Sequence, residues 1–291
     1  DNLATGIYAY YSNQVGDVVY YTGGQGIVWT GSGAYAARSN LVYDNTLGGI
    51  TVSGNGLALT NNTVYQTTGN AVAIDNASNI RLYNNILWTA GGYALAVSSN
   101  SQVGFESDYN LFYTTGPAMV GQWQGAGRNT LNTWRVASFS DANSLYADPL
   151  FVDVDGADGL LGYVSPAADG RDDDFHLRSL FGSVHGGWLA PVRSATTGLP
   201  VQSAGATVAD AVQSPGIDRG RSSDDFSLEP QPNGGFINIG AYGGTAQASL
   251  SPAQYITVFA PNGGESVPQE TNYDIRWRAH GFAGNVDIEV S

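Results

Sequence analysis

The sequence predicts an all-β fold whose first part winds as a parallel β-helix, a solenoid of short stacked strands. Two compositional facts point this way: the 291 residues include 39 glycines, and only 12% of residues are charged. Such a composition favours strands and tight turns over helices. The third observation is a repeat. Three short runs of alternating apolar residues recur at a nearly fixed interval through residues 1–115, with turn residues between them.

The first series of runs places an aliphatic residue before an aromatic one. It reads DVVYY, NLVYD, NTVYQ, NILWT and NLFYT, and the first residues are Asp17, Asn40, Asn62, Asn85 and Asn110, at intervals of 23, 22, 23 and 25. Because strand side chains alternate between faces, the residue two places after each start is expected to point inward. This column consists of Val19, Val42, Val64, Leu87 and Phe112.

The second and third series run in phase with the first. The second reads GIYAY (6–10), GIVWT (26–30), GITVS (49–53), AVAID (71–75) and ALAVS (94–98), and the third AYAA (34–37), LALT (57–60), IRLY (80–83) and VGFE (103–106). Alternation predicts two further inward columns. One contains Ile27, Ile50, Val72 and Leu95 with Trp29, Val52, Ile74 and Val97, and the other contains Leu57, Ile80 and Val103 with Leu59, Leu82 and Phe105.

The length of the repeat separates the candidate folds. Three strands per 23 residues, each stacking on its counterpart one period later, give coils that rise by about 4.8 Å. A β-propeller needs about 40 residues and four antiparallel strands per unit. Leucine-rich repeats share the period, but they need a leucine pattern and a helical segment that these Gly- and Thr-rich runs lack.

Asparagines recur at the bends between runs, among them Asn61, Asn84 and Asn85. Asparagine tolerates left-handed backbone, and its side chain can satisfy the polar groups of a turn. We expect these amides to form ladders from coil to coil, which is an architectural role.

The repeat resembles the right-handed parallel β-helix proteins, the pectate-lyase-like superfamily, over residues 1–115. DPLFVD (148–153), DFHL (174–177), SPGIDRG (214–220) and the glycine-rich run 229–249 resemble the C-terminal extension of secreted bacterial β-helix proteins. PNGGE, IRW and VDIEVS, within 253–291, resemble the first strands of an immunoglobulin-like module. The resemblance implies β-helix coils in 1–115, an irregular extension packing on them in 116–252, an extracellular or cell-surface location in a bacterium, and a chain that belongs to a longer one.

Charge limits the partners. The net charge is −14, with eleven arginines and no lysine, so no basic stripe is available for nucleic acid. No apolar run approaches the roughly 20 residues that span a bilayer, so membrane insertion is not expected. Polysaccharides or other surface proteins are the expected partners, and the open solenoid ends could allow self-assembly.

The repeat offers no catalytic constellation. The β-helix lyases that it resembles use a Lys or Arg base, and Arg81 is the only arginine at an outward strand position of the coils. All three histidines, His176, His185 and His280, lie outside the repeat. Since no pair of acidic residues converges either, we assign no catalytic residue.

An aromatic residue follows the inward aliphatic residue in each coil and should therefore face outward. Aromatic faces bind sugar rings by stacking, so the row predicts a carbohydrate-binding surface. The alternative is that residues 116–250 fold back over this sheet and bury the row. The row consists of Tyr20, Tyr43, Tyr65, Trp88 and Tyr113.

Two acidic segments form a candidate calcium site. DVDGADG (153–159) alternates aspartates with glycines as a calcium loop does, and RDDDFHL (171–177) follows it. Ca²⁺ takes six to eight oxygen ligands, so the second segment would have to complete the first. The alternative is an acidic surface turn. The candidate ligands are Asp153, Asp155, Asp158, Asp172, Asp173 and Asp174.

Three functions from different classes follow. The first is a non-catalytic extracellular β-helix module of a larger secreted or cell-surface protein, structural or adhesive and in contact with carbohydrate. The second, which depends on the resemblance alone, is a polysaccharide lyase or related carbohydrate-active enzyme. The third is a subunit of an extracellular fibre or sheath.

Overall fold

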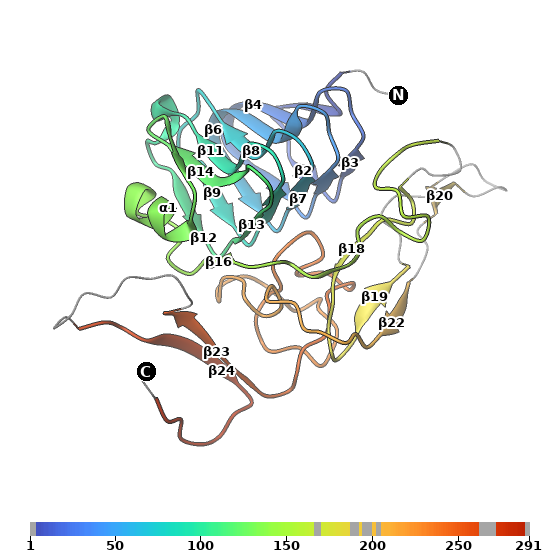
Figure 1. Ribbon diagram of the computed structural model, residues 1–291, viewed down its shortest axis with the longest axis vertical. Coiled ribbons are helices and arrows are strands. Elements are labelled where there is room, and N and C mark those ends of the chain that lie inside the picture. The colour runs from blue at the N-terminus through green and yellow to red at the C-terminus, as the bar shows by residue number, and fades with distance from the viewer. Residues whose placement is uncertain are drawn as a thin grey trace.

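The computed structural model describes residues 4–165, 170–186, 192–193, 200–201, 205–261 and 272–288. Most regular elements are strands in two sheets of a solenoid (Figure 1). The larger sheet has ten strands: β1 (Ile7–Tyr10), β2 (Gln14–Val15), β4 (Gln25–Arg38), β6 (Gly48–Thr60), β8 (Asn70–Ile74), β9 (Arg81–Tyr83), β11 (Tyr93–Val97), β12 (Glu106–Asp108), β14 (Met119–Trp123) and β15 (Ala126–Arg128). The smaller has six: β3 (Val18–Tyr20), β5 (Leu41–Tyr43), β7 (Thr63–Gln66), β10 (Ile86–Thr89), β13 (Leu111–Thr114) and β16 (Leu145–Tyr146).

Every pairing inside the six-stranded sheet is parallel, and its register follows the repeat. Val19 pairs with Val42, Val42 with Val64, and Val64 with Leu87. In the larger sheet, β4 and β6 are long because each bends through two of the predicted runs. The predicted stack of parallel coils is confirmed, and the all-β solenoid fold class with it.

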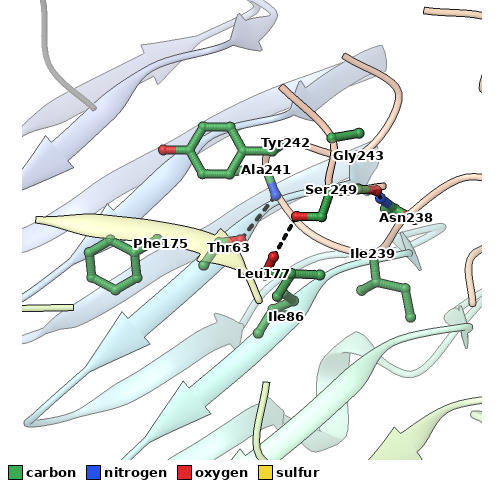
Figure 2. A pocket seen from close by; sticks show the side chains of 11 residues that line it. Thr63, Ile86, Phe175, Leu177, Asn238, Ile239, Ala241, Tyr242, Gly243 and Ser249 are labelled. Atoms are coloured by element: carbon green, nitrogen blue, oxygen red, sulfur yellow. Dashed lines mark hydrogen bonds between the residues drawn. The ribbon is translucent and has the colours of Figure 1, made fainter. Parts of the chain in front are cut away.

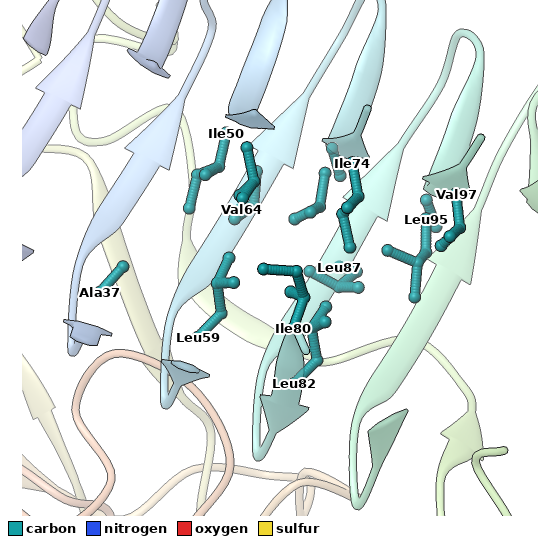
Figure 3. Packing of buried hydrophobic residues seen from close by; sticks show 14 of the residues in the cluster. Ala37, Ile50, Leu59, Val64, Ile74, Ile80, Leu82, Leu87, Leu95 and Val97 are labelled. Atoms are coloured by element: carbon teal, nitrogen blue, oxygen red, sulfur yellow. The ribbon is translucent and has the colours of Figure 1, made fainter. Parts of the chain in front are cut away.

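The core lies between the two sheets, where aliphatic side chains of successive coils touch (Figure 3). Ile50, Ile74 and Val97 point inward from the larger sheet and meet Val64 and Leu87 from the smaller one. The first and second predicted inward columns are buried throughout. Stacking equivalent side chains from coil to coil fills the interior because each coil repeats the shape of the last.

The prediction for the third column is wrong at Val103, which is 73% exposed. A 3₁₀ turn, η1 (Ser99–Ser101), lengthens this coil, and Val103 falls in the turn that follows. Leu82 therefore pairs with Ser107, 25 residues on, instead of with Phe105. Ser107 takes the buried position, while Phe105 packs at the edge of the core.

Asparagine ladders cross the coils as predicted. Asn62 Nδ2 donates to Asn85 Oδ1 at 2.9 Å, and Asn85 Nδ2 donates to Asn110 Oδ1 at 3.0 Å. Each Oδ1 also accepts the backbone N–H of the asparagine one coil earlier. A second, shorter ladder joins Asn84 to Asn61, and both of these residues have positive φ angles. Buried bend groups are thus paired without water.

One α-helix, α1 (Leu131–Ser138), covers the end of the solenoid beyond β14. The composition did not predict it. The Trp134 ring is fully buried and lies against Gly121, where an added Cβ would come within 2.3 Å of the ring. Trp134 Nε1 donates to the buried Asp141 carboxylate at 2.7 Å. The helix therefore closes the core with an aromatic ring that needs a glycine opposite it.

The remaining strands form four antiparallel pairs: β17 (Phe151–Asp153) with β18 (Asp174–Leu177), β19 (Ser183–His185) with β22 (Ala206–Val208), β20 (Val192–Arg193) with β21 (Pro200–Val201), and β23 (Tyr255–Ala260) with β24 (Arg276–His280). The segment from β16 onward runs back along the six-stranded sheet (Figure 1). Phe151, Phe175 and Ile239 pack there against side chains of the sheet.

The glycine-rich run 229–249 seals the contact with the six-stranded sheet. Ala241 N–H donates to Thr63 Oγ1 at 2.9 Å, and the Ser249 hydroxyl donates to the carbonyl of Leu177 (Figure 2). The space left between these groups is about 10 Å³, which is no more than the room for one water molecule. This contact is a packed interface and not a ligand site.

The hairpin β23–β24 contacts the solenoid and the extension through two arginines. Arg276 donates to Asn143 Oδ1 and to the carbonyl of Ala142, and Arg278 donates to the carbonyls of Asp218 and Gly220. Of the motifs that resemble an immunoglobulin-like module, IRW enters β24. PNGGE beyond residue 261 and VDIEVS beyond residue 288 lie outside the described residues.

Candidate binding cleft

The predicted aromatic row lies in register on the outer face of the six-stranded sheet. Parallel pairing joins Tyr20, Tyr43, Tyr65, Trp88 and Tyr113 in that order. Two face-to-face stacks form within it. Ring centroids are 4.8 Å apart for Tyr20 and Tyr43, and 3.9 Å apart for Tyr65 and Trp88.

The extension covers one part of this row. Tyr43 is fully buried, its ring lies 4.7 Å from the Phe175 ring, and its hydroxyl donates to the carbonyl of Gly170 at 3.3 Å. Burial, and after it the nearby charge of Asp173, raises the pKa of Tyr43 far above its usual value. Tyr65 is half-buried, with its edge against Phe175 at 5.4 Å. Tyr43 therefore belongs to the core of the extension.

The other part of the row stays open and lines a cleft of about 420 Å³. Trp88 and Tyr113 are half-buried, as Tyr65 is, and the three rings form the side of the cleft that belongs to the sheet. A volume of this size falls within the range of small-molecule sites, about 300–1,000 Å³. The facing walls come from Thr115, Asp148, Leu150, Phe151, Asp153, Val154, Asp155 and Arg178.

Local structure fixes the acidic wall. DPLFVD enters β17, which pairs antiparallel with β18 of DFHL. A register irregularity lies between Phe151, which is buried, and Asp153, which is exposed. Arg178 follows β18, and its Nη2 donates to the carbonyl of Val152 at 2.7 Å. Asp148 is exposed, and its Oδ1 accepts the backbone N–H of Leu150. The two motifs that mark the extension thus build the wall opposite the aromatic rings.

The electrostatic field in the cleft is negative. Burial, followed by the charges of Asp155 and Asp148, raises the pKa of Tyr65 to about 12. Burial and then Asp148 raise the pKa of Tyr113 in the same direction. The pKa of Asp153 is raised by burial first, and then by a hydrogen bond with Asp155 and by the charge of that residue. A cation or a neutral hydroxylated ligand would therefore meet less repulsion than an anion.

Four of the six predicted calcium ligands lie near the cleft or on the loop beside it. Asp153 and Asp155 both line the cleft, and the charge of Asp155 contributes to the raised pKa of Asp153, after burial. Asp158 donates its backbone N–H to the Asp172 carboxylate at 3.1 Å, with Gly156 packed against the same carboxylate. The structure thus gathers them as two pairs along one loop.

The other two predicted ligands point elsewhere. Asp174 accepts from His176 Nδ1 at 2.7 Å, and both residues are buried. Asp173 is buried beneath the loop, where its carboxylate accepts the backbone N–H of Gly162 at 2.8 Å. Across the part of the chain that the structure describes, no three His, Cys, Asp or Glu side chains are grouped to hold a metal ion. The calcium site stays a prediction.

The sequence predicted the aromatic side of the cleft but not the opposite wall. Asp148, Phe151 and Arg178 lie outside the repeat, and no periodicity relates them to Trp88. The available signal was the pair of motifs DPLFVD and DFHL, which together contain two phenylalanines and three aspartates.

Comparison with known proteins agrees with this architecture. Residues 2–131 match the family model described as the right handed beta helix region. Neither the curated proteins nor the solved structures gave a match. No helix among the described residues is both long and apolar enough to cross a membrane. The parallel register of the coils and the family match over residues 2–131 agree on a right-handed β-helix fold for that part of the chain.

Proposed function

We propose that this protein is a non-catalytic β-helix module of a larger secreted or cell-surface protein, and that it binds a polysaccharide in the cleft beside Trp88. The observation on which the proposal depends is the row of Tyr65, Trp88 and Tyr113, which lines the cleft although the extension buries Tyr43 in the same row. A partly exposed aromatic row beside polar groups is the surface that sugar rings stack on.

The dimensions of the cleft support an extended ligand. Tyr65, Trp88 and Tyr113 stand on three neighbouring strands, so the row runs about 10 Å along the solenoid axis, or two strand spacings. The ring of Tyr65 covers one face of Trp88, and among the described rings none covers the other. A sugar ring could therefore stack on the face of Trp88 that Tyr65 leaves open, and the ligand could extend from there along the cleft.

Binding of soluble glycans to the purified protein tests the proposal. Tryptophan fluorescence and calorimetry would be recorded with oligosaccharides of glucose, of N-acetylated and free amino sugars, and of uronic acids. We expect at least one to bind, and Trp88→Ala to weaken that binding by about tenfold, the effect of losing roughly 1.4 kcal/mol. Trp277→Ala, at an exposed tryptophan of β24, is the matched control and should bind as the wild type does.

Two kinds of result would contradict the proposed binding. The proposal is wrong if no glycan class binds, or if Trp88→Ala and Trp277→Ala bind alike. Release of unsaturated or reducing ends from any of these glycans, lost in a cleft variant, would replace binding with catalysis.

A further inference from the structure

We infer that the cleft selects glycans whose sugars carry free, protonated amino groups, an inference that rests on the proposed carbohydrate binding and names the class of ligand.

The first support is the charge of the cleft. Asp148, Asp153 and Asp155 are exposed on the wall that faces the aromatic row. Arg178 is the single cation that lines the cleft, and its Nη2 is already bonded to the carbonyl of Val152. Three carboxyls and one guanidinium leave a net negative charge, which attracts an ammonium group and repels a carboxylate.

The second support is the aromatic side of the cleft. A cation over an aromatic face gains about 0.5–2 kcal/mol, and tryptophan is the best partner. Trp88 lies between Tyr65 and Tyr113 along the row, opposite the carboxyl groups. An amino sugar could place its ring on the indole and its ammonium group toward Asp148 or Asp155. A neutral sugar would make only the first of these contacts.

The third support is the position of the arginines, which cluster away from the cleft. Four of them, Arg219, Arg221, Arg276 and Arg278, gather around the C-terminal hairpin, and three lie over aromatic rings there. None of these four lines the cleft beside Trp88. Uronates need cations near the sugar, and this molecule keeps its clustered cations at another surface.

The experiment compares hexamers of glucosamine, N-acetylglucosamine, glucose and galacturonic acid by calorimetry at pH 5.5, where amino groups are protonated. We expect the glucosamine hexamer to bind at least tenfold more tightly than the N-acetylated one, and the galacturonic acid hexamer to bind most weakly. The preference should shrink as salt is raised, because these carboxyls are exposed and screened.

Two variants separate charge from stacking. Asp148→Asn combined with Asp155→Asn should remove most of the preference for the glucosamine hexamer over the N-acetylated one and most of the disadvantage of the galacturonic acid hexamer. Asp75→Asn, at an exposed acid after β8 on the other sheet, is the matched control and should change neither. Thermal melting confirms that all three proteins fold.

The outcomes distinguish this inference from the proposed function. If neutral and amino hexamers bind equally, and Trp88→Ala weakens both, the proposed function holds and the inference is wrong. Preference for the galacturonic acid hexamer also overturns it. Absence of binding to every hexamer rejects both statements.

Discussion

Tyr65 and Trp88 stack face to face across neighbouring coils, with ring centroids 3.9 Å apart and planes inclined by 9°. The contact joins the covered and the open parts of one aromatic row, since Tyr65 also touches Phe175 of the extension while Trp88 lines the cleft. The position of the indole therefore depends on the extension as well as on the solenoid.

Removing the Tyr65 ring should destabilise the protein. Tyr65→Ala is expected to cost about 2–4 kcal/mol, because it removes the stack on Trp88 and the edge contacts with Phe151 and Phe175. Tyr65→Phe keeps the ring and should cost well under about 1 kcal/mol. Urea denaturation measures both free energies of unfolding, and equal costs would contradict the role of the ring.

The asparagine ladder should contribute most to the free energy of unfolding at Asn62, which bonds to the coils on both sides. Asn62→Ala removes donors to Asn85 and to the carbonyl of Ala37, and it leaves the N–H of Asn40 without its acceptor. Each buried group left unpaired costs about 1–3 kcal/mol, so the total should exceed about 3 kcal/mol. Asn55→Ala is the control, because Asn55 is an exposed residue of β6 whose side chain makes only exposed hydrogen bonds to serines. Similar losses of stability in both variants would show that the ladder adds little.

Gly121 should tolerate no side chain. A Cβ at this position would come within 2.3 Å of the buried Trp134 ring, so Gly121→Ala should cost about 1–3 kcal/mol through overpacking. Gly91→Ala is the control, since its nearest atoms would be 3.5 Å away and its φ is not positive. Thermal melting compares the two, and a neutral Gly121→Ala would mean that α1 can shift outward.

Stability should fall as pH rises from about 4 to 7. Burial raises the pKa of Asp173 and of Glu229 to about 7 each, and one oxygen of each carboxyl has no hydrogen-bond partner among the described residues. Between the unfolded pKa and 7, the folded state holds a proton that the unfolded state has lost, so unfolding becomes easier with increasing pH and levels off above 7.

Amide variants test this pH dependence. Asp173→Asn should flatten part of the decline and raise the melting temperature at pH 8 relative to wild type, while lowering or not changing it at pH 4. Denaturation at a series of pH values gives the curves. A decline of the same slope in Asp173→Asn would assign the dependence to other groups.

The calcium hypothesis makes a separate prediction. If the loop that contains Asp158 and Asp172 binds Ca²⁺, saturation at 100 times the dissociation constant stabilises the fold by about 2.7 kcal/mol, and EDTA reverses the gain. Asp158→Asn with Asp172→Asn should abolish the response, and Asp75→Asn should keep it. A melting temperature that is indifferent to both Ca²⁺ and EDTA removes calcium from the description of this loop.

The solenoid could be predicted because each coil repeats the same pattern of apolar and turn residues. Val42, Val64 and Leu87 hold equivalent places 22 and 23 residues apart, and local alternation alone assigns them to the core. Val103 was misplaced because η1 adds two residues to its coil, and a strict period cannot anticipate an insertion. The register of one coil depends on its own loop.

The candidate site was predictable on one side only. Trp88 and Tyr113 share the phase of the repeat, which places them outward in neighbouring coils. Asp148 and Arg178 reach the same cleft from a segment with no periodicity, so their position depends on how Phe151 and Phe175 pack on the sheet. Such long-range packing leaves no local pattern in the sequence.

The asparagine ladder also bears on how a molecule of this design can change length. In each coil the asparagine Oδ1 accepts the backbone N–H of the asparagine one coil earlier, and the asparagine Nδ2 donates to the asparagine one coil later. Duplicating one full turn of about 23 residues would therefore insert a coil whose asparagine can form the same hydrogen bonds with the coil before it and the coil after it. Growth by whole turns would also extend the aromatic row by one ring per turn along the outer face of the six-stranded sheet.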